Sequence, residues 1–143
     1  MKTLQDILYR VRIEGIFGRP SIAVTSLSLD SRTLKQGALY IAQKGTQLDG
    51  HDFISQAIKN GARSVICESL PKMCEEGITY VVVNNSAQAL GVMASNFYDN
   101  PSEKLQLIGI TGTNGKTSIS SLLYKLFSLE GYSCGLLSTV SVK

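Results

Sequence analysis

The most constraining feature of the sequence is a glycine-rich turn between an apolar segment and a helix-forming segment. The apolar segment, residues 105–110, has the length and composition of a buried parallel strand. After the turn, apolar residues recur at helical spacing: Ile119, Leu122, Leu123, Leu126 and Phe127. A strand, a glycine-rich turn and a helix in this order predict a loop that binds phosphate.

The residues of this turn are the candidates for binding a nucleotide: Gly112, Thr113, Asn114, Gly115, Lys116, Thr117 and Ser118. Glycines let backbone N–H groups face one point, and a helix N-terminus adds partial positive charge there. Lys116, the candidate catalytic residue, would reach the terminal phosphates, and the Thr117 hydroxyl would bind Mg²⁺. The alternative is a strand-to-helix turn with an incidental lysine, because Ile110 stands where the phosphate-loop pattern has its first glycine.

Composition narrows the class of protein. The 143 residues include 14 basic and 11 acidic side chains, a net charge of +3 that is too small to indicate nucleic-acid or membrane binding. No apolar run approaches the length of a membrane span, and the start of the chain is not a signal peptide, so we expect a cytoplasmic protein. Cys67, Cys74 and Cys134 are too widely spaced for a disulfide framework or a zinc site.

The pattern of apolar runs and turn residues predicts alternating helices and strands. Helices are expected over 3–11, 51–59 and 86–97, the last with Ser86 as its cap, and extended segments over 23–29, 38–42, 64–67, 79–83 and about 132–137. Asp99-Asn100-Pro101 breaks this order. We therefore predict one domain over 1–98, a linker over 99–104, and the incomplete start of a second domain over 105–143, since a nucleotide-binding α/β domain needs more strands.

The densest polar cluster of the first domain is Ser28–Arg32, followed by a second at Gly45–His51. Short hydroxyl and amide groups at strand ends suit hydrogen bonding to a sugar or a base, although turn chemistry is the alternative. Arg32 could bind a carboxylate or phosphate, or pair with an aspartate of either cluster. His51, the single histidine, fits a capping or packing role better than catalysis, since no nucleophile pattern accompanies it.

The two clusters together resemble the Mur ligase family of peptidoglycan-precursor amino-acid ligases. The first match is Asp30-Ser31-Arg32, with Gly37–Ala42, Gly45, Asp49-Gly50-His51, Ala57, Gly61-Ala62 and Glu68. The second is the loop 112–117, including its lack of the first phosphate-loop glycine. The resemblance covers nearly the whole chain.

The resemblance implies an α/β fold: a small UDP-substrate-binding domain, then the first strand, phosphate loop, helix and strand of a truncated ATPase domain. It implies an ATP- and Mg²⁺-dependent ligase that acts on UDP-MurNAc-L-Ala-D-Glu and a diamino acid, through an acyl phosphate. The third residue would be meso-diaminopimelate or L-lysine. If the binding positions of the family are transferred to this sequence, the residues that would bind the uridine end of the UDP-substrate are Leu29, Ser31, Thr46, Gln47 and Leu48. We expect a monomer, and no turnover from these 143 residues alone.

Three alternatives stay open at this stage. Ser118 is more typical of the family members that add D-Ala-D-Ala, whereas Thr113-Asn114 favours those that add the third residue. A non-catalytic nucleotide-binding switch and a small kinase also contain phosphate loops. Binding of a uridine substrate by residues 1–98 would favour the ligase, because neither a switch nor a kinase has reason to bind uridine.

Overall fold

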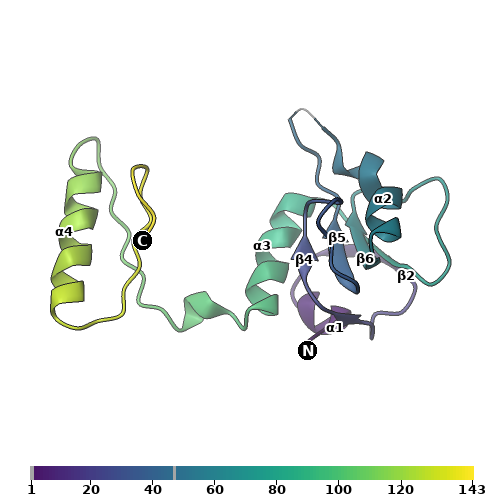
Figure 1. Cartoon of the computed structure of the whole chain (residues 1–143), viewed down its shortest axis with the longest axis horizontal. Coiled ribbons are helices and arrows are strands. Elements are labelled where there is room, and N and C mark those ends of the chain that lie inside the picture. Colours follow the sequence, from purple (N-terminus) through teal and green to yellow (C-terminus); the bar gives the residue numbers. More distant parts are fainter. Residues whose placement is uncertain (1, 47) are drawn as a thin grey trace. The chain divides into compact units, whose positions relative to one another are not determined.

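Five strands form the main sheet of the chain, in the order β2-β7-β6-β5-β4 (Figure 1). The structure, a computed structural model, describes residues 2–46 and 48–143. The strands are β2 (Ile13–Phe17), β4 (Leu27–Ser28), β5 (Ala38–Ile41), β6 (Ala62–Cys67) and β7 (Thr79–Val83). Strands β4 to β7 are parallel, and β2 pairs antiparallel with β7. The carboxyl ends of the four parallel strands therefore meet at one edge of the sheet.

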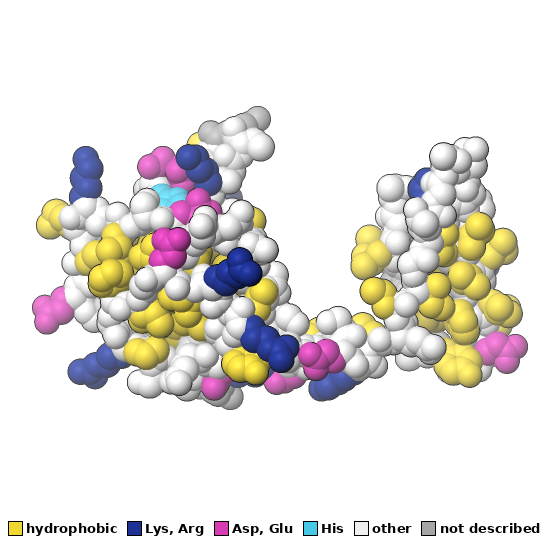
Figure 2. Space-filling model, turned by 180° about the vertical axis from the view of Figure 1, so that it is seen from behind, with side chains coloured by type: hydrophobic (Ala, Val, Ile, Leu, Met, Phe, Trp, Pro, Cys, Tyr) yellow, Lys and Arg dark blue, Asp and Glu magenta, His cyan; other side chains and the backbone are white. Residues whose placement is uncertain are grey.

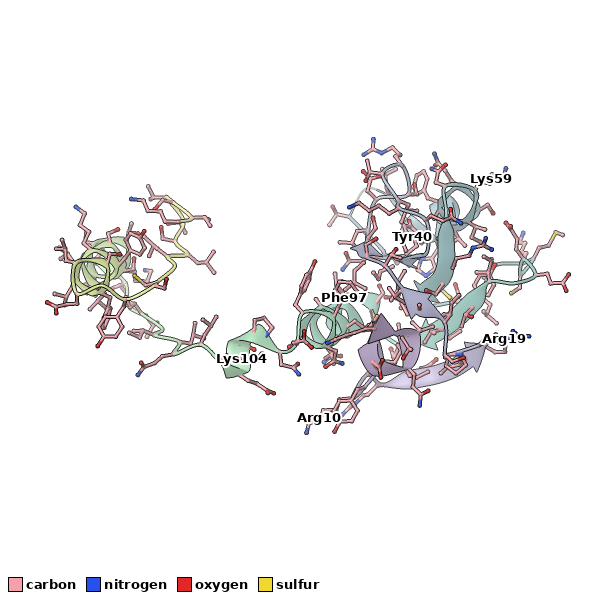
Figure 3. All side chains as sticks on the ribbon, turned by 60° about the horizontal axis from the view of Figure 1, so that its bottom comes forward. Arg10, Arg19, Tyr40, Lys59, Phe97 and Lys104 are labelled. Atoms are coloured by element: carbon pink, nitrogen blue, oxygen red, sulfur yellow. The ribbon has the colours of Figure 1, made fainter. Side chains whose placement is uncertain are left out.

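Helices cover both faces of this sheet. On one face, α1 (Leu4–Ile7) and α3 (Ser86–Phe97) pack their apolar residues against alternate residues of the strands, such as Ile66 and Val81. On the other face, 3₁₀ helix η1 (Gly50–Phe53) and α2 (Ile54–Lys59) pack against residues that include Val65 and Tyr40. The label in Figure 3 shows where Tyr40 lies. Successive residues of a strand face opposite sides of the sheet. Since these strands are apolar at successive positions, both faces of the sheet are apolar, as the continuous apolar runs in the sequence predict.

The chain divides into two compact units, Met1–Lys104 and Leu105–Lys143. The first also contains the two-stranded sheet of β1 (Lys2–Thr3) with β3 (Ala23–Val24), and 3₁₀ helix η2 (Pro101–Glu103). The second contains α4 (Lys116–Leu129). Many of its apolar side chains, among them Leu107, Leu122 and Leu129, are exposed, and Figure 2 shows hydrophobic side chains across its surface.

The helix expected over 3–11 is wrong beyond Ile7. Thr3 and Asp6 form a capping box at its start, but the helix lasts four residues and Arg10 adopts a left-handed backbone with φ 61°. The side-chain amide of Asn96 donates to the Ile7 and Tyr9 carbonyls, replacing the helical acceptor pattern. The apolar periodicity still predicted burial correctly, since Leu4, Ile7 and Leu8 all lie in the core.

Other differences come from pairing that the sequence does not show. The strand β2 was not predicted, and the extended stretch 23–29 is two short strands, β3 and β4, in different sheets. The expected strands over 105–110 and 132–137 are also absent from the described residues, apart from a single bridge between Leu137 and Val142. A strand needs a neighbour for its N–H and C=O groups, and residues 105–110 have no paired strand in this structure.

Two glycines differ in the space that the surrounding backbone leaves for a side chain. A Cβ at Gly50 would lie 2.7 Å from the backbone nitrogen of Gln43, whereas a Cβ at Gly91, within α3, meets no atom within 4 Å. We expect Gly50→Ala to lower the free energy of unfolding by about 1–3 kcal/mol. Gly91→Ala should raise it by about 0.5–1 kcal/mol, because alanine loses less backbone entropy in a helix.

Urea unfolding of both variants, followed by circular dichroism, measures these two changes. Equal effects of the two alanines would contradict the close approach of Gly50 to Gln43.

Candidate functional site

The loop before α4 has the backbone of a phosphate-binding turn. Gly112 and Gly115 have φ of 148° and 79°, conformations that residues with a Cβ rarely adopt. Gly115 is the N-cap of α4, and no side chain caps the helix there. The first N–H groups of a helix lack acceptors within the helix. This helix start is therefore able to donate hydrogen bonds to an anion.

Lys116 folds back over this loop. Its ammonium group donates to the carbonyl of Gly112 and, at 3.4 Å, to the carbonyl of Thr113. A phosphate in the loop would compete with these carbonyls for the ammonium. Thr117 is half-buried, and Thr113, Asn114 and the other loop residues up to Ser118 are exposed. The geometry fits a nucleotide phosphate, and the nucleotide and Mg²⁺ roles of residues 112–118 stay predictions.

The first unit brings the uridine candidates to the carboxyl edge of the parallel strands. Leu29 and Ser31 directly follow β4, and the loop with Thr46 and Leu48 follows the neighbouring strand β5. Leu29, Thr46 and Leu48 are exposed. Gln47 lies outside the described residues. Ligands of open α/β sheets commonly bind at this edge, so the placement is compatible with a substrate site.

Ser31 is held against α2. The side chain is buried, with 6% of the residue exposed, and its hydroxyl donates to Gln56 Oε1 at 3.4 Å. The Asn60 amide donates to the Ser31 carbonyl at 2.7 Å. Gln56 and Asn60 were not predicted as part of this site. Their four-residue spacing, which puts them on one side of a helix, is the signal that could have found them.

Asp30 and Arg32 form an ion pair with two contacts between side chains. The Arg32 guanidinium donates to both carboxylate oxygens of Asp30 at 2.9 Å, and the Arg32 backbone N–H adds a third bond at 2.9 Å. These hydrogen bonds lower the pKa of Asp30 to about 2. In this structure Arg32 therefore pairs with an aspartate of its own cluster, which is one of the alternatives that the sequence left open. The pair is exposed to solvent, so it contributes little to stability.

The loop after β5 is closed at its base. The Gly50 N–H donates to the Gln43 carbonyl, and the Gly45 N–H to the Leu48 carbonyl, both at 2.9 Å. The Tyr40 hydroxyl donates to the Gly50 carbonyl at 2.9 Å. These bonds fix both arms of the loop below Thr46 and Leu48.

A chain of hydrogen bonds joins this loop to the next two strand ends. His51 Nδ1 lies 2.6 Å from Asp49 Oδ1, and the Glu68 backbone N–H donates to His51 Nε2 at 2.8 Å. The Glu68 carboxylate accepts from the Ser86 N–H and hydroxyl at 2.9 and 2.8 Å. Ser86 is therefore not the cap of α3: Asn85 is, through a bond from the Gln88 N–H. The cap of η1 is Asp49, and the His51 ring joins this loop to the backbone of Glu68.

Neither a cluster of metal ligands nor a helix able to span a membrane is present in residues 2–46 and 48–143. No group of three or more His, Cys, Asp or Glu side chains there could hold a metal ion. No helix there is both long enough and apolar enough to cross a membrane.

Comparison with known proteins decides the family. The model described as "Mur ligase family, catalytic domain" matches residues 23–98, which is more than half of the chain. The chain belongs to the Mur ligase family. Its sequence is 48% identical over 138 residues to the UDP-N-acetylmuramoyl-L-alanyl-D-glutamate–2,6-diaminopimelate ligase of Cytophaga hutchinsonii, covering 96% of this chain and 28% of that protein.

Solved structures of Mur ligases share the fold. A UDP-N-acetylmuramoyl-L-alanyl-D-glutamate–2,6-diaminopimelate ligase matches with a TM-score of 0.70 at 27% identity, covering 99% of this chain and 28% of that one. The MurF ligase of Thermotoga maritima, in complex with ADP, matches with a TM-score of 0.56 at 30% identity, covering 73% and 23%. The chain thus spans about a quarter of the length of these relatives.

Glu68 should make the stability of the first unit sensitive to acid. The bonds from Ser86 hold the pKa of Glu68 below its ordinary value of 4.5. Because the pKa of Glu68 is lower in the folded state, the ionised carboxylate stabilises that state fully above the ordinary pKa of 4.5. This stabilisation is lost as the pH falls through the folded-state pKa. We expect Glu68→Gln to lower the melting temperature at about pH 7 and to change it much less at about pH 3.

Thermal melts of the two proteins across this pH range measure the effect, with the exposed Glu76→Gln as the matched control. A Glu68→Gln deficit that is the same at both pH values would contradict the assignment.

Proposed function

We propose that this chain forms the substrate- and nucleotide-binding start of an ATP-dependent ligase that adds 2,6-diaminopimelate to UDP-MurNAc-L-Ala-D-Glu. The observation that carries the proposal is the 48% identity, over 96% of the chain, to a ligase named for that reaction. L-lysine is the less supported third residue, because no relative described above is named for it. By the same resemblance, the reaction would take place in the cytoplasm.

The second unit would bind ATP and Mg²⁺. ATP supplies the phosphoryl group that activates the substrate carboxylate for attack by the incoming amine. The N–H groups at the start of α4 would hold the phosphates, Lys116 would neutralise charge on the transferring group, and Thr117 would bind Mg²⁺. Two features support this assignment: the glycine backbone of the loop, and a related structure that contains ADP.

The first unit would hold the uridine end of the substrate at the carboxyl edge of the sheet. Leu29 and Leu48 offer exposed apolar side chains for a base to pack on, and Thr46 offers a hydroxyl. The Ser31 hydroxyl has only a long bond, 3.4 Å, to Gln56. A uracil carbonyl near the end of β4 would be an alternative acceptor for this hydroxyl. Gln47 completes the proposed set.

Addition of D-Ala-D-Ala is the second candidate. A specific observation favours it: a MurF ligase is among the similar structures, and Ser118 follows the Lys-Thr pair here. The 48% identity to the diaminopimelate-adding relative supports the first candidate more strongly than 30% identity to MurF supports the second.

Ser31→Ala tests the substrate site. Loss of one hydrogen bond to a neutral partner should weaken binding of UDP-MurNAc-L-Ala-D-Glu by about 0.5–1.5 kcal/mol, or several-fold, and leave ATP binding unchanged. Calorimetric titration of the chain with both ligands measures this, with Ser102→Ala, an exposed serine of η2, as the control. Unaltered affinity of Ser31→Ala for the UDP-substrate would contradict the proposed substrate site and would mean that the Asp-Ser-Arg cluster only forms a turn.

Lys116→Ala tests the nucleotide site, in the protein at the full length of its relatives. Since Lys116 is proposed to act on the transferring phosphoryl group, the variant should lose most ligase activity and keep its affinity for the UDP-substrate. Steady-state phosphate release gives kcat. Lys125→Ala, an exposed lysine on the same helix, is the matched control. A near-normal kcat for Lys116→Ala would refute the phosphate-loop assignment.

A further inference from the structure

The sequence contains two asparagines that are followed directly by a glycine. Asn60-Gly61 lies at the end of α2, and Asn114-Gly115 directly precedes α4 (Figure 1). An asparagine in such a pair can react with its own backbone, because glycine lacks the Cβ that hinders the approach to its nitrogen in other residues. The two pairs share this chemistry and differ in what surrounds them.

The reaction joins the glycine nitrogen to the side-chain carbonyl carbon of the asparagine. The glycine nitrogen loses its proton as the new C–N bond forms, and the side-chain nitrogen leaves as ammonia, which carries that proton away. The product is a succinimide ring, and water then opens this ring at either of its carbonyls to give aspartate or isoaspartate. The net change replaces an amide by a carboxylate, and water is the only other reactant.

The pair at the end of α2 is held against ring closure. The Asn60 side-chain amide donates to the Ser31 carbonyl at 2.7 Å. The Gly61 N–H donates to the Ile58 carbonyl at 3.0 Å. Gly61 is also buried, and a Cβ there would lie only 3.1 Å from Gln36 Cα. Both reacting groups are therefore engaged, and the end of α2 would have to open before they could meet.

The pair before α4 has neither restraint. In residues 2–46 and 48–143, no hydrogen bond is made by the Asn114 side chain or by the Gly115 N–H, and the bonds across this loop are those that Lys116 donates. Asn114 and Gly115 are both exposed. A Cβ at Gly115 would meet only the end of the Ile119 side chain, at 3.8 Å, so the space around this residue is open. The amide carbon and the nitrogen that attacks it are therefore free to approach each other.

We propose that Asn114 is a site of spontaneous deamidation, and that a nucleotide bound to its loop prevents the reaction. Asn60 has the same neighbour in sequence and is protected by its contacts within the fold. The first part of the proposal needs only the geometry of the loop. The protection by a nucleotide rests on the proposed function, because it assumes that the loop binds the phosphates of ATP.

Phosphate binding and deamidation compete for the same loop. Phosphates bound by the N–H groups at the start of α4 would fix the Gly115 nitrogen and keep it away from the Asn114 side chain. After deamidation, the new carboxylate places a negative charge where phosphate would bind, and isoaspartate also adds a carbon to the backbone of the turn. Because the ammonia is lost, the change is one-way, and an empty loop would lose its nucleotide site with time.

The first test is incubation of the chain in warm, mildly alkaline buffer, with peptide mapping by mass spectrometry at intervals. We expect Asn114 to gain the mass difference between an amide and a carboxyl group. Asn60 should react about tenfold more slowly, because two hydrogen bonds must break first. In concentrated urea, which removes the folded contacts, both pairs should react at similar rates. Equal rates in the folded chain, or an unchanged ratio of the two rates in urea, would overturn the proposal.

Asn114→Gln is the matched control, because a glutamine would have to close a larger ring, which forms much more slowly. This variant should show no deamidation at position 114 and an unchanged rate at Asn60. Circular dichroism shows whether the variant is folded. Reaction of the variant at the native rate would contradict ring closure as the route and overturn the proposal.

The second test uses the protein at the full length of its relatives, with and without ATP and Mg²⁺. ATP should slow the deamidation of Asn114 and leave that of Asn60 unchanged. In calorimetric titrations, Asn114→Asp should bind ATP about tenfold more weakly than Asn114→Gln, because both variants lose the asparagine and only the first adds a charge.

The outcomes separate this proposal from the proposed function. If the protein binds ATP but Asn114 reacts equally fast with and without it, the protection by a nucleotide is overturned and the function stands. Equal ATP affinities of the two variants would overturn the link between deamidation and loss of the nucleotide site. If the protein binds no ATP, the function and the protection are both overturned, and the rates of Asn114 and Asn60 in the first test still decide whether Asn114 is a modification site.

Discussion

Parallel pairing of β4 to β7 is the constraint on which the first unit depends. It brings four strand ends to one edge, so that residues far apart in sequence become neighbours there. Ser31, the loop after β5, Glu68 and Ser86 are all placed by this one fact. The apolar strands that make the edge possible are buried on both faces, which is why substitutions within them would disturb the polar groups at their ends.

The second unit depends on backbone conformation instead of on a sheet. Gly112 and Gly115 adopt left-handed angles, and α4 begins directly after Gly115 without a side-chain cap, so this turn forms from local backbone conformation. This locality explains why the glycine-rich turn and the helix after it could be predicted from sequence: glycine spacing and helix periodicity are both short-range signals. The pairing of residues 105–110 is long-range, and that strand was predicted but does not form here.

The difference between short-range and long-range signals also explains which elements of the first unit could be predicted from sequence. Strands β5, β6 and β7 and helix α3 were predicted because dense apolar runs and turn residues mark them. Strand β2 was missed, because its residues Ile13–Phe17 include Gly15 and are mostly exposed at an edge. Leu29 and Ser31 could be placed at a strand end from sequence. The contacts that Gln56, Asn60 and Glu68 make could not be predicted, because they arise only when α2 and β6 pack beside β4 and β5.

The Glu68 carboxylate has a consequence for where an anion can bind. It sits on the first N–H of α3, so this helix start is already neutralised by an anion of the chain itself. Helix starts at the carboxyl edge of a sheet are where many α/β proteins attract phosphate. Here that attraction is cancelled within the first unit, whereas the start of α4 has no side-chain cap. Of these two helix starts, that of α4 is therefore the one left to attract an anion.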